Sequence, residues 1–205
     1  MRNSITPLPG GRLRKEYRGT LAWKREITLL RQMAGSGLCP ELLDAPLRQA
    51  EMTECPGVPL GEGIRAASRQ EAREMMAALA AWTDAFEREY HRRTGQTAVP
   101  EDLSPGNFLW DSASRKITGL DFEFWHTGSP AENRGGLLCM AERLKAAEIT
   151  GEELAGELYR QFRGGSDRAE LEHRAARARQ QTALRQRAMP LIRQTAGVIL
   201  AGGQS

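Results

Sequence analysis

The sequence has few cysteines, few histidines and no long apolar run, and each shortage argues against a class of protein. Its 205 residues include three widely spaced cysteines, Cys39, Cys55 and Cys139, and no C-x-x-C pair. This pattern favours reduced thiols in a cytoplasm over a disulfide framework or a cysteine-ligated zinc site. The three histidines also lack the spacing of metal ligands.

Membrane insertion and export are not expected. No apolar run approaches the roughly 20 residues that a membrane-spanning helix needs. The first eleven residues contain no apolar signal core. A hydrophobic fraction of 40% and a charged fraction of 27% are ordinary for a globular protein. The length fits one domain, or two small lobes that share a cleft.

The net charge of +3 conceals an uneven distribution of charge. Residues 1–31 hold eight lysines and arginines against two glutamates, and residues 166–193 hold seven arginines against three acidic residues. Such basic ends could bind nucleic acid or a phosphorylated ligand. Because no aromatic-rich or glycine-arginine segment accompanies them, we favour solvent-exposed basic faces over a nucleic-acid site.

The N-terminal part is predicted to form a small sheet with one helix. Residues 5–8 and 12–18 flank a Pro-Gly-Gly turn and predict a hairpin, with Leu13, Lys15 and Tyr17 on one face of its second strand. Apolar residues at helical spacing then predict a helix from Trp23 to Ala34, with Glu26 beside the apolar stripe. Two short strands (41–45 and 50–55) and a linker (56–59) follow.

The larger remainder is predicted to be mainly helical, which makes the fold class α+β with two lobes. Ser68 and Glu71 form a capping box before a long buried helix, and Thr150 and Glu153 form another. The predicted helices cover residues 69–91, 133–147, 151–162 and 167–188, and a strand pair covers 108–110 and 116–120.

Three polar residues gather around this strand pair. Asp102 and Asn107 lie five residues apart in the loop before the first strand, and Asp121 follows the second strand. Because a hairpin returns its end close to its start, the three side chains are expected to meet at one edge. Phosphoryl transfer requires such a set, since one carboxylate handles the acceptor while another carboxylate and an amide oxygen hold magnesium.

Several segments, in this order, resemble the protein kinases and the aminoglycoside-phosphotransferase-like kinases. PEDLSPGN and DFE are similar to the catalytic-loop and Asp-Phe-Gly motifs, and LRKEYRG is similar to the strand that bears the phosphate-binding lysine. KREITLLRQMAGSGLCPELLDA resembles the helix with the partner glutamate, and AEMTECPGVPL resembles the hinge strand. SPAENRGGLLCMAERL resembles the small atypical kinases, nearest to the KEOPS-complex kinase and lipopolysaccharide-kinase-like proteins.

The resemblance implies a two-lobed, protein-kinase-like fold, with a truncated N-lobe at residues 1–56 and a helical C-lobe at 57–165. It implies an ATP- and Mg²⁺-dependent phosphotransferase that acts on a hydroxyl of a small molecule or a protein. The implied roles are as follows: Lys15 contacts the phosphates and pairs with Glu26, Glu54 and Cys55 belong to the adenine-contacting hinge, Asp102 is the catalytic base, and Asn107 and Asp121 are metal ligands.

Three departures from the family pattern support an alternative to an active phosphotransferase. Pro100 stands in place of the usual histidine, Glu123 replaces the glycine of Asp-Phe-Gly, and the fourteen residues before Lys15 leave room for one hairpin but not for a glycine-rich loop. The Gly10-Gly11 turn is a poor substitute, because a phosphate-covering loop uses several backbone amides. The alternative is a catalytically degenerate, regulatory kinase-like module.

The last nine residues, 197–205, carry a separate pattern. An apolar stretch runs into Gly202 and Gly203, as at the start of a nucleotide-binding domain. This resembles the opening of molybdenum cofactor guanylyltransferases, with residues 166–196 as a basic helix and linker before a fused nucleotidyltransferase. An apolar C-terminal tail is the other interpretation.

Overall fold

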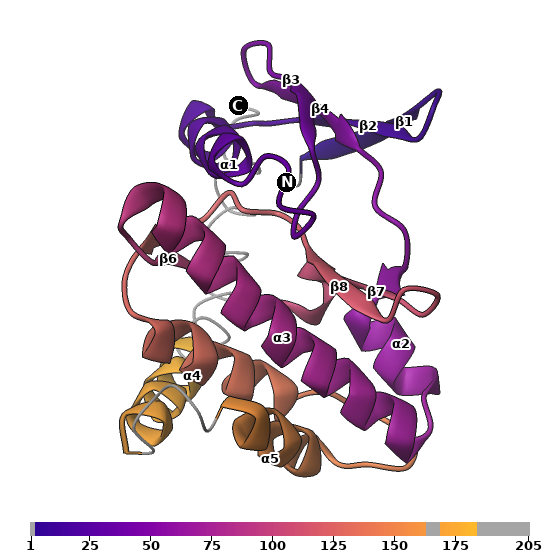
Figure 1. The fold of residues 1–205 in the computed structure, drawn as a ribbon, viewed down its shortest axis with the longest axis vertical. Coiled ribbons are helices and arrows are strands. Elements are labelled where there is room, and N and C mark those ends of the chain that lie inside the picture. Colours follow the sequence, from indigo (N-terminus) through magenta and orange to yellow (C-terminus); the bar gives the residue numbers. More distant parts are fainter. Residues whose placement is uncertain (1–2, 163–168, 184–205) are drawn as a thin grey trace, which may run out of the picture.

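The computed structural model describes residues 3–162 and 169–183, which form two lobes of a protein-kinase-like fold (Figure 1). The smaller N-terminal lobe has a four-stranded antiparallel sheet in the order β1-β2-β4-β3 and one helix. Its elements are β1 (Ser4–Leu8), β2 (Arg12–Glu16), α1 (Thr20–Gln32), β3 (Leu42–Asp44) and β4 (Gln49–Thr53). The predicted hairpin, helix and two short strands are therefore confirmed.

Strand β2 lies inside this sheet, and it carries the lysine. Lys15 lies opposite Ile5 of β1 and Ala50 of β4. Lys15 and Tyr17 are buried and Leu13 is half-buried, as the alternation of the strand predicts. On α1, the indole of Trp23 donates a hydrogen bond to the carbonyl of Gln49 at 2.9 Å, which fixes the helix to the sheet.

The C-terminal lobe is mainly helical and contains two small antiparallel sheets, β5-β7-β8 and β6-β9. Its elements are β5 (Val58–Pro59), α2 (Leu60–Ala66), α3 (Arg69–Thr94), β6 (Ala98–Pro100), the 3₁₀ turn η1 (Pro105–Asn107), β7 (Phe108–Asp111), β8 (Lys116–Gly119), β9 (Trp125–Thr127), α4 (Pro130–Ala141) and α5 (Gly151–Gln161). Residues 169–183 form a further helix.

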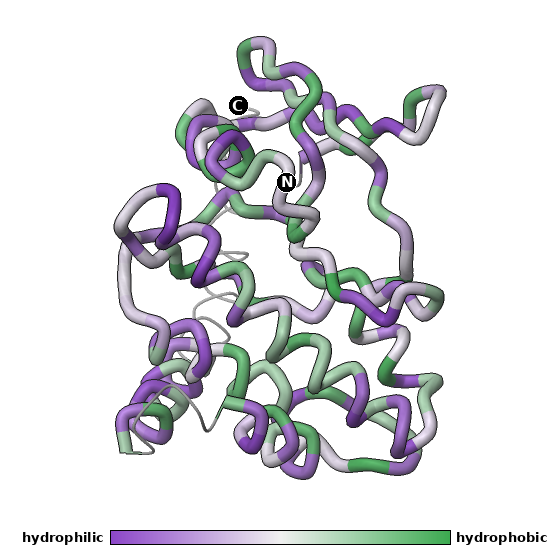
Figure 2. The backbone as a smooth tube through the Cα atoms, viewed as in Figure 1, coloured by the Kyte–Doolittle hydropathy of each residue, from purple (hydrophilic) through white to green (hydrophobic). Residues whose placement is uncertain are grey.

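Helix α3 is the central element of this lobe. Ser68 and Glu71 form the predicted capping box, and Gly95 ends the helix in the left-handed conformation with φ 71°. Hydrophobic and hydrophilic residues alternate along the helix (Figure 2), and its apolar side is buried, including Leu79 and Phe86. The helix supplies an apolar support for the loops that precede β7 and follow β8.

Some predicted boundaries differ from those observed. The helix predicted at 133–147 is α4, which begins earlier because Pro130 suits the first helical turn, and which ends at Ala141. Helix α2 and strands β5, β6 and β9 were not predicted. Of the helix predicted at 167–188, residues 169–183 are helical and bury Leu171 and Ala175. The predicted nucleotidyltransferase start lies outside the described residues.

One hydrophobic core cluster extends through both lobes, from Tyr17 to Phe162 and on to the helix at 169–183. Hydrogen bonds also join the lobes. The indole of Trp82 donates to the carbonyl of Leu38 at 2.8 Å, and the indole of Trp125 donates to the carbonyl of Arg25 at 3.1 Å. Within the described part of the chain, none of the helices is both long and apolar enough to span a membrane.

Candidate active site

The loop between β6 and β7 holds Asp102 and Asn107. Ser104 caps the 3₁₀ turn by accepting a hydrogen bond from the amide of Gly106, and the side-chain amide of Asn107 donates to the carbonyl of Asp102 at 3.0 Å. The carbonyl of Asn107 accepts from the amide of Leu120 at 2.8 Å. This last bond brings the end of the loop next to the residue that precedes Asp121, as the hairpin predicts.

Asp121 has a backbone conformation that few residues other than glycine adopt. Its φ is +60°, in the left-handed region, where aspartate is more common than most residues. The next residue anchors it: the Phe122 ring stacks on Phe86 with centroids 5.6 Å apart, and the Phe122 amide donates to the carboxylate of Glu26 at 3.2 Å. Such backbone conformations cluster at functional sites.

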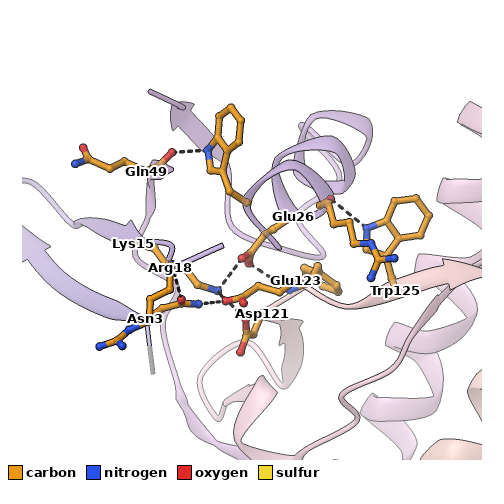
Figure 3. A network of polar contacts seen from close by, with 11 residues as sticks. Asn3, Lys15, Arg18, Glu26, Gln49, Asp121, Glu123 and Trp125 are labelled. Atoms are coloured by element: carbon orange, nitrogen blue, oxygen red, sulfur yellow. Dashed lines mark hydrogen bonds and ion pairs between the residues drawn. The ribbon is translucent and has the colours of Figure 1, made fainter. Parts of the chain in front are cut away.

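Lys15 lies among three carboxylates, as Figure 3 shows. Its Nζ is 2.7 Å from Glu26, 2.6 Å from Asp121 and 2.7 Å from Glu123. Burial alone would lower the pKa of Lys15, but the charges of Glu26 and Asp121 and the hydrogen bonds that Lys15 donates to Asp121 and Glu123 together raise it. The lysine is therefore fully protonated at neutral pH.

Glu123 is the member of this cluster whose contact the sequence did not predict. It is buried, and it accepts a hydrogen bond from the side chain of Asn3 as well as pairing with Lys15. Burial raises the pKa of Glu123, the Lys15 ammonium lowers it, and the nearby Asp121 carboxylate raises it, with a net increase. The only sequence signal was its place two residues after Asp121, which indicated negative charge near the proposed metal.

All seven predicted site residues line one cavity of about 1100 Å³ between the lobes. They are Lys15, Glu26, Glu54, Cys55, Asp102, Asn107 and Asp121. Apolar side chains line the same cavity, among them Leu13, Met52 and Leu109. An apolar pocket with a few convergent polar groups is the usual form of a small-molecule site.

Glu54 and Cys55 are the residues predicted to form the hinge, and one of their backbone amides is already hydrogen-bonded. The amide of Glu54 donates to the carbonyl of Gly11 at 2.8 Å. The amide of Cys55 is the next N–H along the chain, because Pro56 has none.

The Gly10-Gly11 turn does not take part in the cavity. Both glycines have positive φ, of 78° and 66°, as the tight turn between β1 and β2 requires. They lie at the end of the hairpin remote from Lys15, whose partner on β1 is Ile5, and neither is among the cavity-lining residues. Two basic residues, Arg18 and Arg25, do line the cavity.

The oxygen atoms near Lys15 fit a divalent cation. Within the described ranges, Glu26, Asp121 and Glu123 each offer a carboxylate oxygen, and these atoms lie within 4.8 Å of one another. Three carboxylates around one ammonium leave a formal surplus of two negative charges. Mg²⁺ prefers oxygen ligands of this kind, and Asn107 lines the same cavity with a further side-chain oxygen.

Helix α4 supports the loop from below. The side chain of Asn133 donates to the carbonyl of Ala98 on β6 at 2.9 Å. The neighbouring Arg134 is 3.0 Å from both Glu87 and Asp84 of α3. Burial raises the pKa of Glu87 to about 7, against the opposing effect of Arg134. The strand that leads to Asp102 is thus held by a buried polar network.

No protein-family model matches the sequence, and a comparison with curated proteins finds no match. Solved structures, in contrast, are similar in fold. A gentamicin complex of APH(2″)-IIa superposes with a TM-score of 0.63 at 10% identity, over 84% of this chain and 77% of that chain. ADP-bound aminoglycoside phosphotransferase APH(2″)-Ib superposes with a TM-score of 0.59 at 11% identity, over 85% of this chain and 81% of that chain. A choline/ethanolamine kinase family protein from Mesorhizobium loti superposes with a TM-score of 0.59 at 16% identity, over 83% of this chain and 69% of that chain.

Proposed function

We propose that the chain is an ATP-dependent, magnesium-assisted phosphotransferase that acts on a hydroxyl of a small molecule or a protein. The observation that carries the proposal is the convergence of Lys15, Glu26, Asp102, Asn107 and Asp121 on one interlobe cavity. The fold shared with phosphotransferases and a choline/ethanolamine kinase family protein supports it. The same residue types, so placed, meet the requirements of phosphoryl transfer, which are positioning and charge neutralisation.

Each residue has a distinct part in the proposed reaction. Lys15 binds the phosphates, with Glu26 holding its ammonium in place, and Arg18 and Arg25, which line the same cavity, add positive charge. Asp102 orients the acceptor hydroxyl and accepts its proton. Oxygens of Asp121, Glu123 and Asn107 are the ligands for Mg²⁺, which neutralises the developing phosphate charge when it is bound.

Calorimetric titration with ATP and Mg²⁺ is the direct test of this function. The protein is expected to bind MgATP in a 1:1 ratio, and Lys15→Met is expected to weaken binding at least tenfold. Arg160→Ala removes an exposed arginine of α5 that, among the described residues, pairs with its neighbour Glu157, and it is a suitable control. An intact, folded protein that binds no ATP would remove the proposal.

A second candidate is a catalytically degenerate, regulatory module of the same fold. It is favoured by the position of Gly10 and Gly11 outside the cavity and by the three carboxylates that engage Lys15. Nucleotide binding without turnover, unaffected by Asp102→Ala, would support it. If a longer chain carries a nucleotidyltransferase domain, removal of residues 1–195 should then alter the activity of that domain.

A further inference from the structure

A second cavity, of about 630 Å³, lies on the other side of the Asp102 loop. Asp102 and Ser104 line both this cavity and the interlobe cavity. A molecule in the second cavity can therefore reach the carboxylate that the proposed reaction requires without competing for the space of the nucleotide. The other walls come from β6, β9, α4 and the helix at 169–183.

The second cavity is formed by a close approach of helices. A Cβ atom on Gly135 of α4 would lie 2.5 Å from the Cβ of Arg174, and one on Gly136 would lie 2.5 Å from Leu103 in the Asp102 loop. The two glycines thus allow the helix at 169–183 and the loop to pack against the same stretch of α4. As a result, Arg174 and Arg177 line the cavity that contains Asp102.

Two of the acidic residues that line the cavity, Glu101 and Glu132, share one partner. The two ring nitrogens of His126 lie 3.4 Å from Glu101 and 3.1 Å from Glu132. Glu132 is in the first turn of α4, whereas Arg143 lies beyond the end of that helix, a separation of roughly 15 Å along its axis. Arg143 therefore lies far from Glu132 along the helix.

The basic groups of the cavity are only weakly paired with carboxylates among the described residues. Arg143 donates to the neutral hydroxyl of Thr182, and Arg174 is 3.7 Å from Glu170, which is nearly half exposed. Among the described residues, Arg177 forms no ion pair, and the Nε of Arg174 is buried without a hydrogen-bond partner. Arg179, on the same helix but not lining the cavity, pairs with Glu142.

We propose that the second cavity binds the acceptor, and that the acceptor is a small hydroxylated anion whose carboxylate or phosphate pairs with Arg174 and Arg177 while its hydroxyl lies at Asp102. The inference rests on the proposed function. Guanidinium groups bind carboxylate and phosphate in a forked geometry, and their charge enriches anions in a concave site.

In the reaction, the acceptor O–H bond breaks and its proton moves to Asp102. A bond forms from the acceptor oxygen to the γ-phosphorus, and the bond from that phosphorus to the β,γ-bridging oxygen breaks, which releases ADP.

The test measures binding of four probes to the full chain without nucleotide: glycerol 3-phosphate, glycerate, neutral glycerol and cationic gentamicin. Both anions are expected to bind and glycerol is not. Arg177→Ala should weaken anion binding about tenfold, the effect of losing one charge-assisted hydrogen bond. Arg174→Ala should act in the same direction, and Arg179→Ala should have no effect. A difference between the two anions would identify phosphate or carboxylate as the preferred group.

Lys15→Met, once far-UV circular dichroism shows that it is folded, tests the nucleotide cavity separately and should retain anion binding in the second cavity. Binding of gentamicin in preference to both anions would overturn the inference, as would anion binding that is unchanged in Arg177→Ala and in Arg177→Glu. A protein that binds ATP but neither anion would also overturn it and leave the proposed function intact. Anion binding that is lost in Lys15→Met but kept in Arg177→Ala would assign the anion to the nucleotide cavity, against the inference.

Discussion

The ammonium of Lys15 on β2 lies 2.6 Å from the carboxylate of Asp121, which follows β8, so an ion pair joins the two lobes at the cavity between them. Glu26 and Glu123 complete the surroundings of the lysine. Because three carboxylates share one ammonium, the cluster has spare negative charge. In the proposed reaction, this charge is what a divalent cation would neutralise.

Replacement of Asp102 tests the proposed base. Asp102→Asn should lower turnover by about two to four orders of magnitude, the usual effect of losing a general base. Nucleotide affinity should change little, because Lys15 and Asp121 remain. Steady-state kinetics with calorimetry separate the two effects, and undiminished turnover in this variant would contradict the assignment.

Replacement of Lys15 tests the charge balance of the cluster. Lys15→Met leaves Glu26 and Glu123 buried without their cation, and the free energy of unfolding should fall by about 3–5 kcal/mol. The pKa of Glu123, already raised by burial, rises further when the ammonium is absent. A group whose pKa is raised on folding destabilises the folded state as pH rises, so the deficit should be larger at pH 8 than at pH 5.

The matched control for this variant is the double substitution Lys15→Met with Glu123→Gln. The amide carries no charge, so the double variant should recover part of the stability and lose most of the added pH dependence. Urea unfolding at pH 5 and pH 8 measures both quantities. An equal deficit in the single and the double variant would show that Glu123 does not contribute to the cluster.

Glu87 predicts a pH dependence of stability that does not involve the cavity. Burial raises its pKa to about 7 in the folded state, above the ordinary value of 4.5. The stability that this group contributes is fully present below about pH 4.5 and is lost as pH rises through 7. In Glu87→Gln, the free energy of unfolding should therefore change less between pH 5 and 8, with a reduction of up to about 3 kcal/mol in that change.

Chemical unfolding across this pH range, followed by far-UV circular dichroism, measures the Glu87 effect. Glu89→Gln is the control, because its hydrogen bonds with Arg92 and Arg93 lower the pKa of Glu89 to about 2. Glu89 therefore does not titrate between pH 5 and 8. If both variants gave the same profile as the unmodified chain, the buried network at Glu87 would not account for the pH dependence.

A pair of helical glycines tests the close packing on α4. At Gly135 an added Cβ would lie 2.5 Å from the Cβ of Arg174 and 2.9 Å from the backbone of Ala175, whereas at Gly156 in α5 it would meet nothing within 4 Å. Gly135→Ala should cost about 1–3 kcal/mol through overpacking. Gly156→Ala should stabilise the protein by about 0.5–1 kcal/mol, because alanine is the better helix former. Thermal unfolding of both variants gives the comparison.

The sequence predicted the elements that carry the site because their signals are local. Alternation in β2 placed Lys15 on the buried face, and the hairpin of β7 and β8 predicted that Asn107 and Asp121 would be neighbours. These patterns depend on residues a few positions apart. Seven residues predicted for the site line one cavity, although their individual roles stay predictions.

The remaining features depend on contacts between distant segments. Strands β6 and β9 have three residues each and pair across 25 to 29 positions, so neither has a periodic pattern of its own. Glu123 contacts Lys15 and Asn3 only once the lobes are assembled. The second cavity arises because Gly135 admits the helix at 169–183 and Gly136 admits Leu103, packing relations that periodicity does not encode.

The hydrophobic core that continues from one lobe to the other limits how the molecule can move. Trp82 and Trp125 each tie a C-lobe side chain to an N-lobe carbonyl. Wide swinging of one lobe against the other would break these bonds and expose packed side chains to water. Ligand entry is therefore expected to depend on local rearrangement at the rim of the cleft, where Ile5, Leu21 and Phe124 are solvent-exposed. The two lobes, as far as the structure describes them, should unfold in one cooperative step.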